Sequence, residues 1–283
     1  MQAERFVFTA NQRASSVLRV IGGARERLVL SLFRCDDFRI LDAIGAALQR
    51  GVDVAVLVTS RAKGGAKRLD ELWGVLENMG AALHRYADPV VKYHAKYLVA
   101  DDGPALVASL NFTRRCFTST CDFLLTTHDP VVVGGLRRLF AADSRGPESA
   151  PPSRLGNRLI VGPEHARRAL TGLLEQARRS IRIVDPKVTD PAIVDLLKTK
   201  RAEGVEVTVL GREGLRQHVP HGKMLLVDEA IGVLGSLSLS ALSLDFRREV
   251  AVVVHDPQCL EQMNRVFRRL ASGPAPGRAR PVN

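Results

Sequence analysis

The amino-acid sequence predicts an α/β fold built from two duplicated α/β/α sandwich domains with mixed, largely parallel sheets. Two observations support this prediction. Short apolar strands alternate with amphipathic helices, and one set of polar residues occurs twice in the same order. A chain of 283 residues is long enough for two domains that each bury a core. We expect a pseudo-twofold axis between the copies and an active site at their interface.

The expected elements follow the same order in both halves. In the first half they are a helix over 11–25, a strand over 27–33, a helix over 37–50 and a strand over 52–58. Their second-half equivalents are 163–178, 180–184, 189–203 and 205–210, and the halves close with helices over 130–141 and 257–271. Asp129-Pro130 and Asp190-Pro191 indicate helix starts, because aspartate caps free N–H groups and proline fits the first turn.

Composition separates the two halves. The stretch from Asp143 to Pro152 contains serine, glycine, glutamate and three prolines, which is typical of a linker. We therefore expect a first domain over 1–142, a linker over 143–157 and a second domain over 158–271. Residues 272–283 are rich in proline, glycine and arginine and are expected to form a disordered tail.

The repeated polar motif has a fixed spacing. Its first copy is His94, Lys96, Asp101, Ser109 and Asp122, and its second copy is His221, Lys223, Asp228, Ser236 and Glu249. Every second-copy residue lies 127 positions after its counterpart, whereas earlier matches such as Gly51-Val52 with Gly204-Val205 are 153 apart. The first half therefore carries 26 extra residues (153 − 127) between about Thr59 and Tyr93.

Strand geometry predicts which motif residues act together. Residues two apart on a strand point to the same face, so His94 and Lys96 should project together, as should Ser109 and Asn111. Asp101 is seven positions from His94 and would face away on an unbroken strand. We therefore expect Asp101, and Asp228 in the second copy, to support the site from behind rather than take part in catalysis.

Two imidazoles, two ammonium groups and several hydroxyl or amide groups suit a phosphoester. Lys96 and Lys223 would supply positive charge, and hydrogen bonds to phosphate would come from Ser109, Asn111, Ser236 and Ser238. One neutral histidine can attack phosphorus, and the other can donate a proton to the leaving oxygen and later activate water or an alcohol. Asp122 and Glu249 are the natural partners for the far ring nitrogens.

A metal site is the main competing chemistry for paired histidines. Zinc would require further ligands at suitable spacing. Cys116 and Cys121 are five apart without a second pair, and Cys35 and Cys259 are isolated. We therefore expect neither a metal nor a cofactor.

The motif resembles that of the phospholipase D superfamily, H-x-K-x4-D-x6-G-S-x-N, which usually occurs twice per chain. Both copies fit, with Ala108 in place of the first glycine, Ser238 in place of the second asparagine and Asp122 where glutamate is usual. The resemblance covers roughly residues 1–271. It implies metal-independent catalysis through a phosphohistidine, with His94 as the nucleophile and His221 as the acid and base.

The segment of extra residues begins with a cationic stretch that contains Arg61, Lys63, Lys67 and Arg68. A flexible loop with four cations leading toward His94 could grip the phosphate or head group as a flap. It could equally be a mobile surface loop, and the sequence leaves both interpretations open.

Charge and hydropathy restrict the partners and the location. The net charge of +11 favours anionic partners, either lipid surfaces or nucleic acid. No apolar run approaches the ~18 residues that span a bilayer, and the N-terminus does not resemble a secretory signal. Four scattered cysteines suit a reducing compartment. We expect a cytoplasmic protein, or one that contacts an anionic membrane peripherally.

The resemblance to the phospholipase D superfamily implies an enzyme that hydrolyses the phosphodiester of a glycerophospholipid, or transfers its phosphatidyl group. The alternative is a metal-independent nuclease acting on DNA or RNA, which the sequence pI of about 10.1 favours. With both motifs in one chain, we expect a monomer that forms an internal pseudo-dimer.

Overall fold

The computed structural model describes residues 4–61, 65–146, 155–213, 215 and 219–272. The first half contains β1 (Glu4–Val7), α1 (Ala10–Gly23), β2 (Arg27–Leu32), α2 (Phe38–Gln49), β3 (Asp53–Thr59), α3 (Ala66–Asn78), β4 (Ala82–Tyr86), β5 (Lys92–Tyr93), β6 (Tyr97–Ala100), β7 (Ala105–Ala108), α4 (Arg114–Thr118), β8 (Thr120–Cys121), β9 (Leu124–Thr127) and α5 (Pro130–Ser144). The second half contains β10 (Leu159–Val161), α6 (Ala166–Glu175), β11 (Ser180–Val184), α7 (Pro191–Ala202), β12 (Glu206–Leu210), β13 (Val219–Pro220), β14 (Lys223–Val227), β15 (Ile231–Gly235), α8 (Ala241–Asp245), β16 (Arg247–Arg248), β17 (Val250–Val254) and α9 (Pro257–Ala271).

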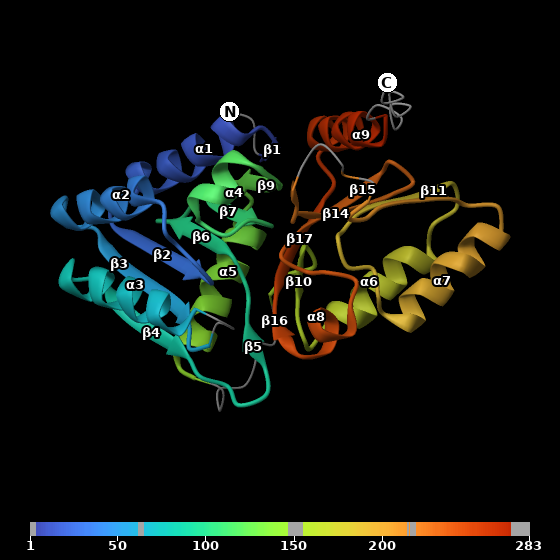
Figure 1. Cartoon of the computed structure of the whole chain (residues 1–283). Helices are drawn as coiled ribbons and strands as arrows, with labels where there is room; N and C mark the ends of the chain where they lie inside the picture. The colour runs from blue at the N-terminus through green and yellow to red at the C-terminus, as the bar shows by residue number, and fades with distance from the viewer. Residues whose placement is uncertain (1–3, 62–64, 147–154, 214, 216–218, 273–283) are drawn as a thin grey trace, which may run out of the picture.

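Each half is organised around one mixed sheet (Figure 1). The strand order is β1-β9-β7-β6-β2-β3-β4 in the first sheet and β10-β17-β15-β14-β11-β12 in the second. Without β4, the two orders are equivalent strand by strand, which agrees with the duplicated α/β architecture. Within these sheets the pairs β2–β3, β3–β4 and β11–β12 are parallel, and the other described neighbours are antiparallel. The sheets are therefore mixed, as expected, but most of their described strand pairs are antiparallel.

The extra residues of the first half contain α3 and β4. β4 extends the sheet beyond β3 in parallel register, from Ala55 beside Ala82 to Thr59 beside Tyr86. The buried leucines of α3 hold the helix against the sheet: Leu69, Leu72 and Leu76. The segment is therefore a packed addition to one edge of the first sheet.

The two sheets share a single core at the centre of the molecule. Val107 and Leu125 from the first sheet lie in the same apolar cluster as Leu234 and Val252 from the second. Helices α5 and α9 contribute to this inner cluster, whereas α1, α2 and α3 cover the outer face of the first sheet and α6, α7 and α8 that of the second (Figure 1). Burial of this shared apolar surface fixes how the halves are oriented.

Two short parallel ribbons connect the halves near this core. β13 of the second half pairs with β8 of the first, and β16 of the second half pairs with β5 of the first. In each ribbon, one strand leads into a motif histidine and the other into a motif carboxylate. The ribbons therefore bring a histidine from one half next to the carboxylate of the other.

The expected helix starts are confirmed. A carboxylate oxygen of Asp129 accepts a hydrogen bond from the N–H of Val131 at 2.7 Å, and Asp190 caps α7 through the N–H of Ile193 at 3.1 Å. Helix α5 runs on to Ser144, two residues into the expected linker. Residues 147–154 of the expected linker and the tail over 273–283 lie outside the described residues.

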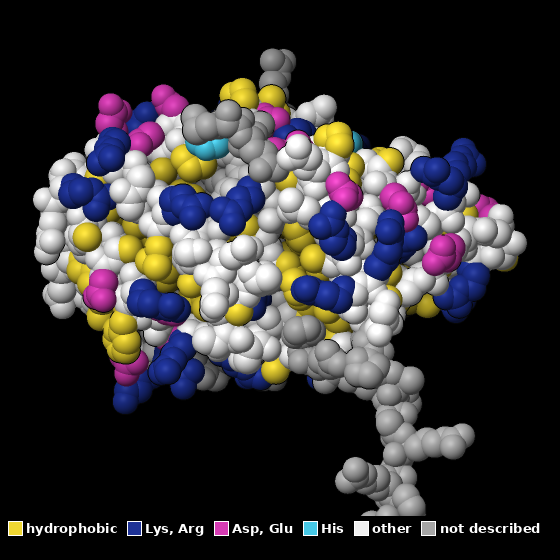
Figure 2. All heavy atoms as spheres, turned by 90° about the horizontal axis from the view of Figure 1, so that it is seen from above, with side chains coloured by type: hydrophobic (Ala, Val, Ile, Leu, Met, Phe, Trp, Pro, Cys, Tyr) yellow, Lys and Arg dark blue, Asp and Glu magenta, His cyan; other side chains and the backbone are white. Residues whose placement is uncertain are grey.

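The surface shows basic side chains at many places. Seen from above, Lys and Arg side chains are spread across the whole face with acidic side chains among them, rather than gathered in one patch (Figure 2). Among the described residues, no helix is long and apolar enough to span a membrane.

Candidate active site

The two motif histidines leave the ribbons at equivalent points. His94 follows β5 and His221 follows β13. His94 and Lys96 lie between β5 and β6 rather than within one strand, because the chain passes here from the ribbon into the main sheet. The local arrangement is the same in both copies: the Nζ of Lys96 donates to the carbonyl of His94 at 2.5 Å, and that of Lys223 donates to the carbonyl of His221 at 2.7 Å.

Each histidine is held by the carboxylate of the other half. The Nδ1 of His94 lies 2.9 Å from an oxygen of Glu249, and the Nδ1 of His221 lies 2.9 Å from an oxygen of Asp122. Both carboxylates are fully buried. This contact fixes Nδ1 as the nitrogen that faces the carboxylate, so the Nε2 of each ring remains for chemistry.

Burial sets the protonation of the first histidine and lysine. Burial lowers the pKa of His94 to about 3, even though Glu249 favours the charged ring. Burial also lowers the pKa of Lys96 to about 7. Burial acts to raise the pKa of Asp122 and of Glu249, but their histidine partners outweigh it and both pKa values lie below the usual range. His94 is therefore neutral and Glu249 ionised at neutral pH.

Both histidines open into one cavity of about 560 Å³. Phe33 and His94 are its lining residues from the first half, and all others come from the second. Lys223, Arg247, Lys187 and Arg212 place four cations on its wall. The cavity thus offers two imidazoles and positive charge to an anionic group, but it extends mainly over the second half.

The family model described as "Cardiolipin synthase, PLD-like domain" matches residues 17–144 and 210–271. These segments contain both histidines, both lysines and both carboxylates. The chain belongs to this PLD-like family. A search of the curated proteins finds no match.

Polyphosphate kinase and phosphatidylserine synthase are two solved structures that share this fold. Polyphosphate kinase from Porphyromonas gingivalis matches 94% of this chain and 46% of its own length, with a TM-score of 0.77 and 20% identity. The PLD-like chain therefore spans less than half of that enzyme. Phosphatidylserine synthase from Haemophilus influenzae Rd KW20 matches 95% of this chain and 86% of its own length, with a TM-score of 0.70 and 14% identity. The phospholipase D family member Nuc from Salmonella typhimurium covers 49% of this chain and 92% of its own, with a TM-score of 0.44 and 20% identity.

The two PLD-like motif serines are both fully buried, and each hydroxyl accepts a hydrogen bond from the N–H of an equivalent residue, Phe123 for Ser109 and Val250 for Ser236. Ser109 is fully buried and donates to a carboxylate oxygen of Asp122 at 2.7 Å. Ser236 lines the cavity and donates to the carbonyl of Val250 at 3.2 Å. The Oδ1 of Asn111 is buried without a hydrogen-bond partner in the described part of the chain. Of these three, only Ser236 lines the cavity.

Ser238, which replaces the second motif asparagine, is engaged with a buried carboxylate. Its hydroxyl donates to Asp185 at 2.9 Å, and Asp185 is 2% exposed at the end of β11. Burial raises the pKa of Asp185, although Lys223 opposes this shift. The first half has the apolar Leu32 at the equivalent position (185 − 153 = 32). The sequence analysis missed Asp185, which lacks a counterpart in the other copy.

The motif aspartates Asp101 and Asp228 lie in turns away from the cavity. Asp101 accepts hydrogen bonds from the N–H groups of residues 25–27 at 2.8–2.9 Å, and Asp228 accepts them from residues 178–180 at 2.7–2.9 Å. Each carboxylate thereby joins the start of one strand to the end of its antiparallel neighbour. These contacts support a structural role.

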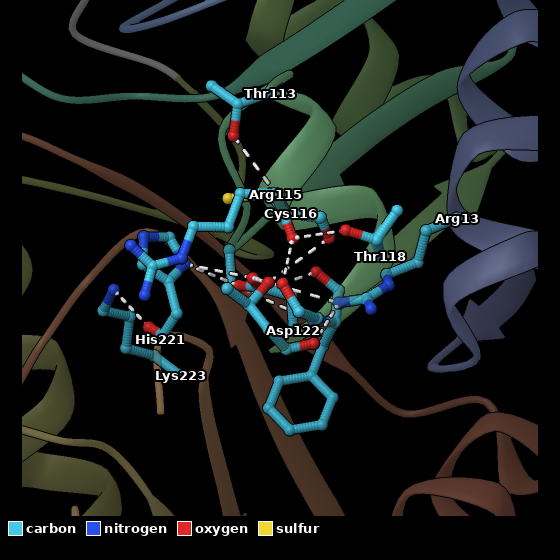
Figure 3. Close-up of polar contacts among 12 residues, drawn as sticks. Arg13, Thr113, Arg115, Cys116, Thr118, Asp122, His221 and Lys223 are labelled. Atoms are coloured by element: carbon cyan, nitrogen blue, oxygen red, sulfur yellow. Dashed lines mark hydrogen bonds and ion pairs between the residues drawn. The ribbon is translucent and has the colours of Figure 1, made fainter. Parts of the chain in front are cut away.

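Four residues near the site were not found from the sequence. Phe33 packs edge-on against His94 with ring centroids 4.6 Å apart. Arg13 is buried with its Nη1 3.9 Å from Asp122, and Arg247 lies 3.8 Å from Glu249. Arg115 extends from α4 on the side where His221 and Lys223 lie (Figure 3). For each of these four residues, the equivalent position in the other half holds a different type of residue. Comparison of the two halves therefore could not identify them.

The described residues of the predicted substrate loop do not line the cavity. Arg61 donates to the carbonyl of Asp88, and Lys67 and Arg68 lie in the first turns of α3 rather than in a loop. None of these three lines the cavity, and Lys63 lies outside the described residues.

Cys116 contributes to the only group of potential metal ligands in the described residues. One ligand atom each from Cys116, Asp122 and His221 lies within 4.8 Å of the others. The second half has Ser243 at the equivalent position (116 + 127 = 243), where its hydroxyl donates to Glu249 at 3.1 Å. Because serine is a poor zinc ligand, we interpret Cys116 as the counterpart of a hydrogen-bonding residue rather than as part of a metal site.

Proposed function

We propose that this chain is a phosphodiesterase of phospholipase D type that hydrolyses glycerophospholipids or transfers their phosphatidyl group. The observation that carries the proposal is the pair of crossed histidine–carboxylate contacts at one cavity. Neither half can assemble a working histidine alone, because Glu249 orients His94 and Asp122 orients His221. Two oriented imidazoles at one cavity suit a two-step displacement at phosphorus.

In the first step, the Nε2 of His94 attacks phosphorus. An N–P bond forms, the P–O bond to the head group breaks, and His221 gives its proton to the departing oxygen. The assignment of the nucleophile is supported by burial, because the pKa of His94 is lowered to about 3 and its ring is neutral. The His94 side chain is 15% exposed and that of His221 is 27% exposed, which suits exchange of protons between His221 and incoming water.

In the second step, water or an alcohol attacks the phosphohistidine. His221 takes the proton of the attacking oxygen, the P–N bond breaks and His94 returns to its neutral form. Lys223 on the cavity wall and Lys96 behind Phe33 stabilise the negative charge on the phosphoryl oxygens.

Two comparisons support a lipid substrate. The matching family model is described by cardiolipin synthase, and phosphatidylserine synthase shares the fold over most of both chains. The alternative is a nuclease, which the net charge of +11 favours. On the face seen from above, however, the basic side chains do not form one continuous patch (Figure 2).

A side-by-side assay tests the proposal. Purified protein would be incubated, in excess chelator, with vesicles of phosphatidylcholine, phosphatidylglycerol and cardiolipin, and separately with single- and double-stranded DNA and RNA. We expect release of head group or phosphatidic acid, absent in the His94→Asn variant. Nucleic-acid cleavage with inert vesicles would favour the nuclease instead, and restoration of lost activity by a divalent ion would contradict the metal-independent mechanism.

A further inference from the structure

Exposed apolar side chains gather around the mouth of the cavity. Leu242 lines the cavity and is 56% exposed, and Phe246 at the end of α8 is 47% exposed. Val219 precedes the lining residue Pro220 and is 37% exposed. Val90 is 62% exposed, just before β5, where the N–H of Lys92 donates to the carbonyl of Phe246 at 3.0 Å. We call these four residues the apolar lip.

Exposed large apolar side chains are concentrated near the cavity. In the part of the chain that the structure describes, eight large apolar side chains are markedly exposed, and half of them form the apolar lip. Scattered exposed apolar residues are normal, but several of them around the mouth of one cavity indicate an interaction site.

The pseudo-symmetry shows that the apolar lip is not a general consequence of the fold. Position 242 corresponds to Arg115 (242 − 127), position 246 to Ser119 and position 219 to Lys92. The same places are thus apolar in the second half and polar or basic in the first. Arg115 and Lys92 are exposed, and neither forms an ion pair with another described residue.

An anionic lipid bilayer has the complementary chemistry. Its acyl region accepts apolar side chains, and its phosphates attract arginine and lysine side chains near the surface. A phospholipid that leaves the bilayer at this point would meet the apolar lip with its acyl chains and the cationic cavity with its phosphate.

We propose that the apolar lip, flanked by Arg115 and Lys92, docks this protein on an anionic lipid surface and delivers the phospholipid to the cavity. The delivery step rests on the proposed function, whereas docking itself does not require turnover. The apolar lip, three of whose four residues come from the second half, would therefore hold the lipid part of the substrate, and Arg115 and Lys92 of the first half would face the membrane phosphates.

The test combines vesicle binding with two kinds of activity. The double variant Phe246→Ser and Val90→Ser changes two lip residues that do not line the cavity. Val75→Ser is the matched control, because Val75 is 39% exposed on α3 in the outer helix layer of the first half. Binding would be measured by flotation with vesicles of phosphatidylcholine and phosphatidylglycerol, and turnover on those vesicles and on the soluble diester bis-p-nitrophenyl phosphate.

We expect the double variant to bind anionic vesicles roughly ten-fold more weakly and to turn over vesicles correspondingly more slowly. Its turnover of the soluble diester and its melting temperature should match those of Val75→Ser. Equal vesicle binding by the double variant and the control would overturn the proposal, as would failure of the unaltered chain to bind. Lip-dependent binding without phospholipid turnover would retain the docking surface and reject the proposed function.

Discussion

Both histidines of the two histidine–carboxylate centres line the cavity, but of their two carboxylate partners Asp122 is enclosed, whereas Glu249 lines the cavity as well. Asp122 accepts hydrogen bonds from Ser109 at 2.7 Å and Thr120 at 2.5 Å, in addition to His221. Its arginine is Arg13, which reaches it from α1 and is 3% exposed. Ser109, Thr120 and Arg13 do not line the cavity, so they support the Asp122 carboxylate from the side away from the substrate site.

Glu249 is supported by a different set of groups. It accepts a hydrogen bond from Ser243 at 3.1 Å and one from His94, and Arg247 lies 3.8 Å away. The Arg247 side chain is 28% exposed and lines the cavity, so it can face substrate and carboxylate at once. Duplication has therefore kept the reacting groups while the supporting residues diverged, and one arginine became available to the substrate.

The largest expected difference between the centres concerns the covalent intermediate. His94→Asn should lower turnover at least about 10⁴-fold and form no phosphoenzyme, because the attacking nitrogen is gone. His221→Asn should be comparably slow but accumulate the phosphoenzyme from a diester with a good leaving group, because that step needs little acid catalysis. Mass spectrometry of quenched protein would detect the adduct. An adduct in His94→Asn alone would reverse the two roles.

The carboxylates should differ in the step that they affect. Asp122→Asn and Glu249→Gln each keep the shape but weaken the hold on one imidazole, so we expect losses of about 10³-fold. With a diester that has a good leaving group, Glu249→Gln should slow formation of the phosphoenzyme, whereas Asp122→Asn should slow its breakdown, in which His221 acts as the base. Rapid-quench kinetics would separate the steps. The same step slowed in both variants would contradict the division of labour between the centres.

The two arginines should separate stability from substrate binding. Arg13→Met removes a buried cation that also donates to the carbonyl of Thr120 at 2.9 Å. The buried negative charge of Asp122 then has less positive charge beside it. We expect it to lower the free energy of unfolding by about 3 kcal/mol. Arg247→Met should cost less than about 1 kcal/mol but raise KM. Urea denaturation and steady-state kinetics would measure both, and equal losses of stability would show that Arg247 is also a structural group.

The buried motif lysine, Lys96, should make the activity of the enzyme fall at alkaline pH. Lys96 is 1% exposed and burial lowers its pKa to about 7, so its positive charge is lost as pH rises through that value. We therefore expect kcat/KM to fall above about pH 7. A bound phosphate favours the charged lysine, so kcat should fall at higher pH than kcat/KM. Lys96→Met should be slower and lack this alkaline limb, whereas its persistence would assign the limb to another group.

The repeat allowed the sequence to predict the duplicated fold and the motif residues near the cavity. A fixed offset of 127 identifies equivalent residues without any knowledge of the structure. The same offset could not show that Asp122 contacts His221 rather than His94, because that depends on how the halves pack. The crossed contacts arise from the two interdomain ribbons, whose strands are only two residues long and give no periodic signal.

The supporting residues were beyond prediction for a different reason. Arg13 lies on a helix far from the motif in sequence, and Phe33 follows a strand with no polar pattern. Asp185 differs from its first-half equivalent, Leu32, so the comparison of halves could not identify it. Tertiary packing alone brings these residues to the site, and symmetry in the sequence is informative only where both copies retained the same side chain.

The smallest expected effect concerns the cationic stretch of the first half. A flap would raise KM when Arg61, Lys67 and Arg68 are replaced by alanine. Because none of these three lines the cavity, and Arg61 is engaged by the carbonyl of Asp88, we expect KM to change less than about two-fold. Arg247→Ala, on the cavity wall, is the matched control and should raise KM clearly. A rise in the triple variant equal to that of the control would show that this stretch reaches the substrate during turnover.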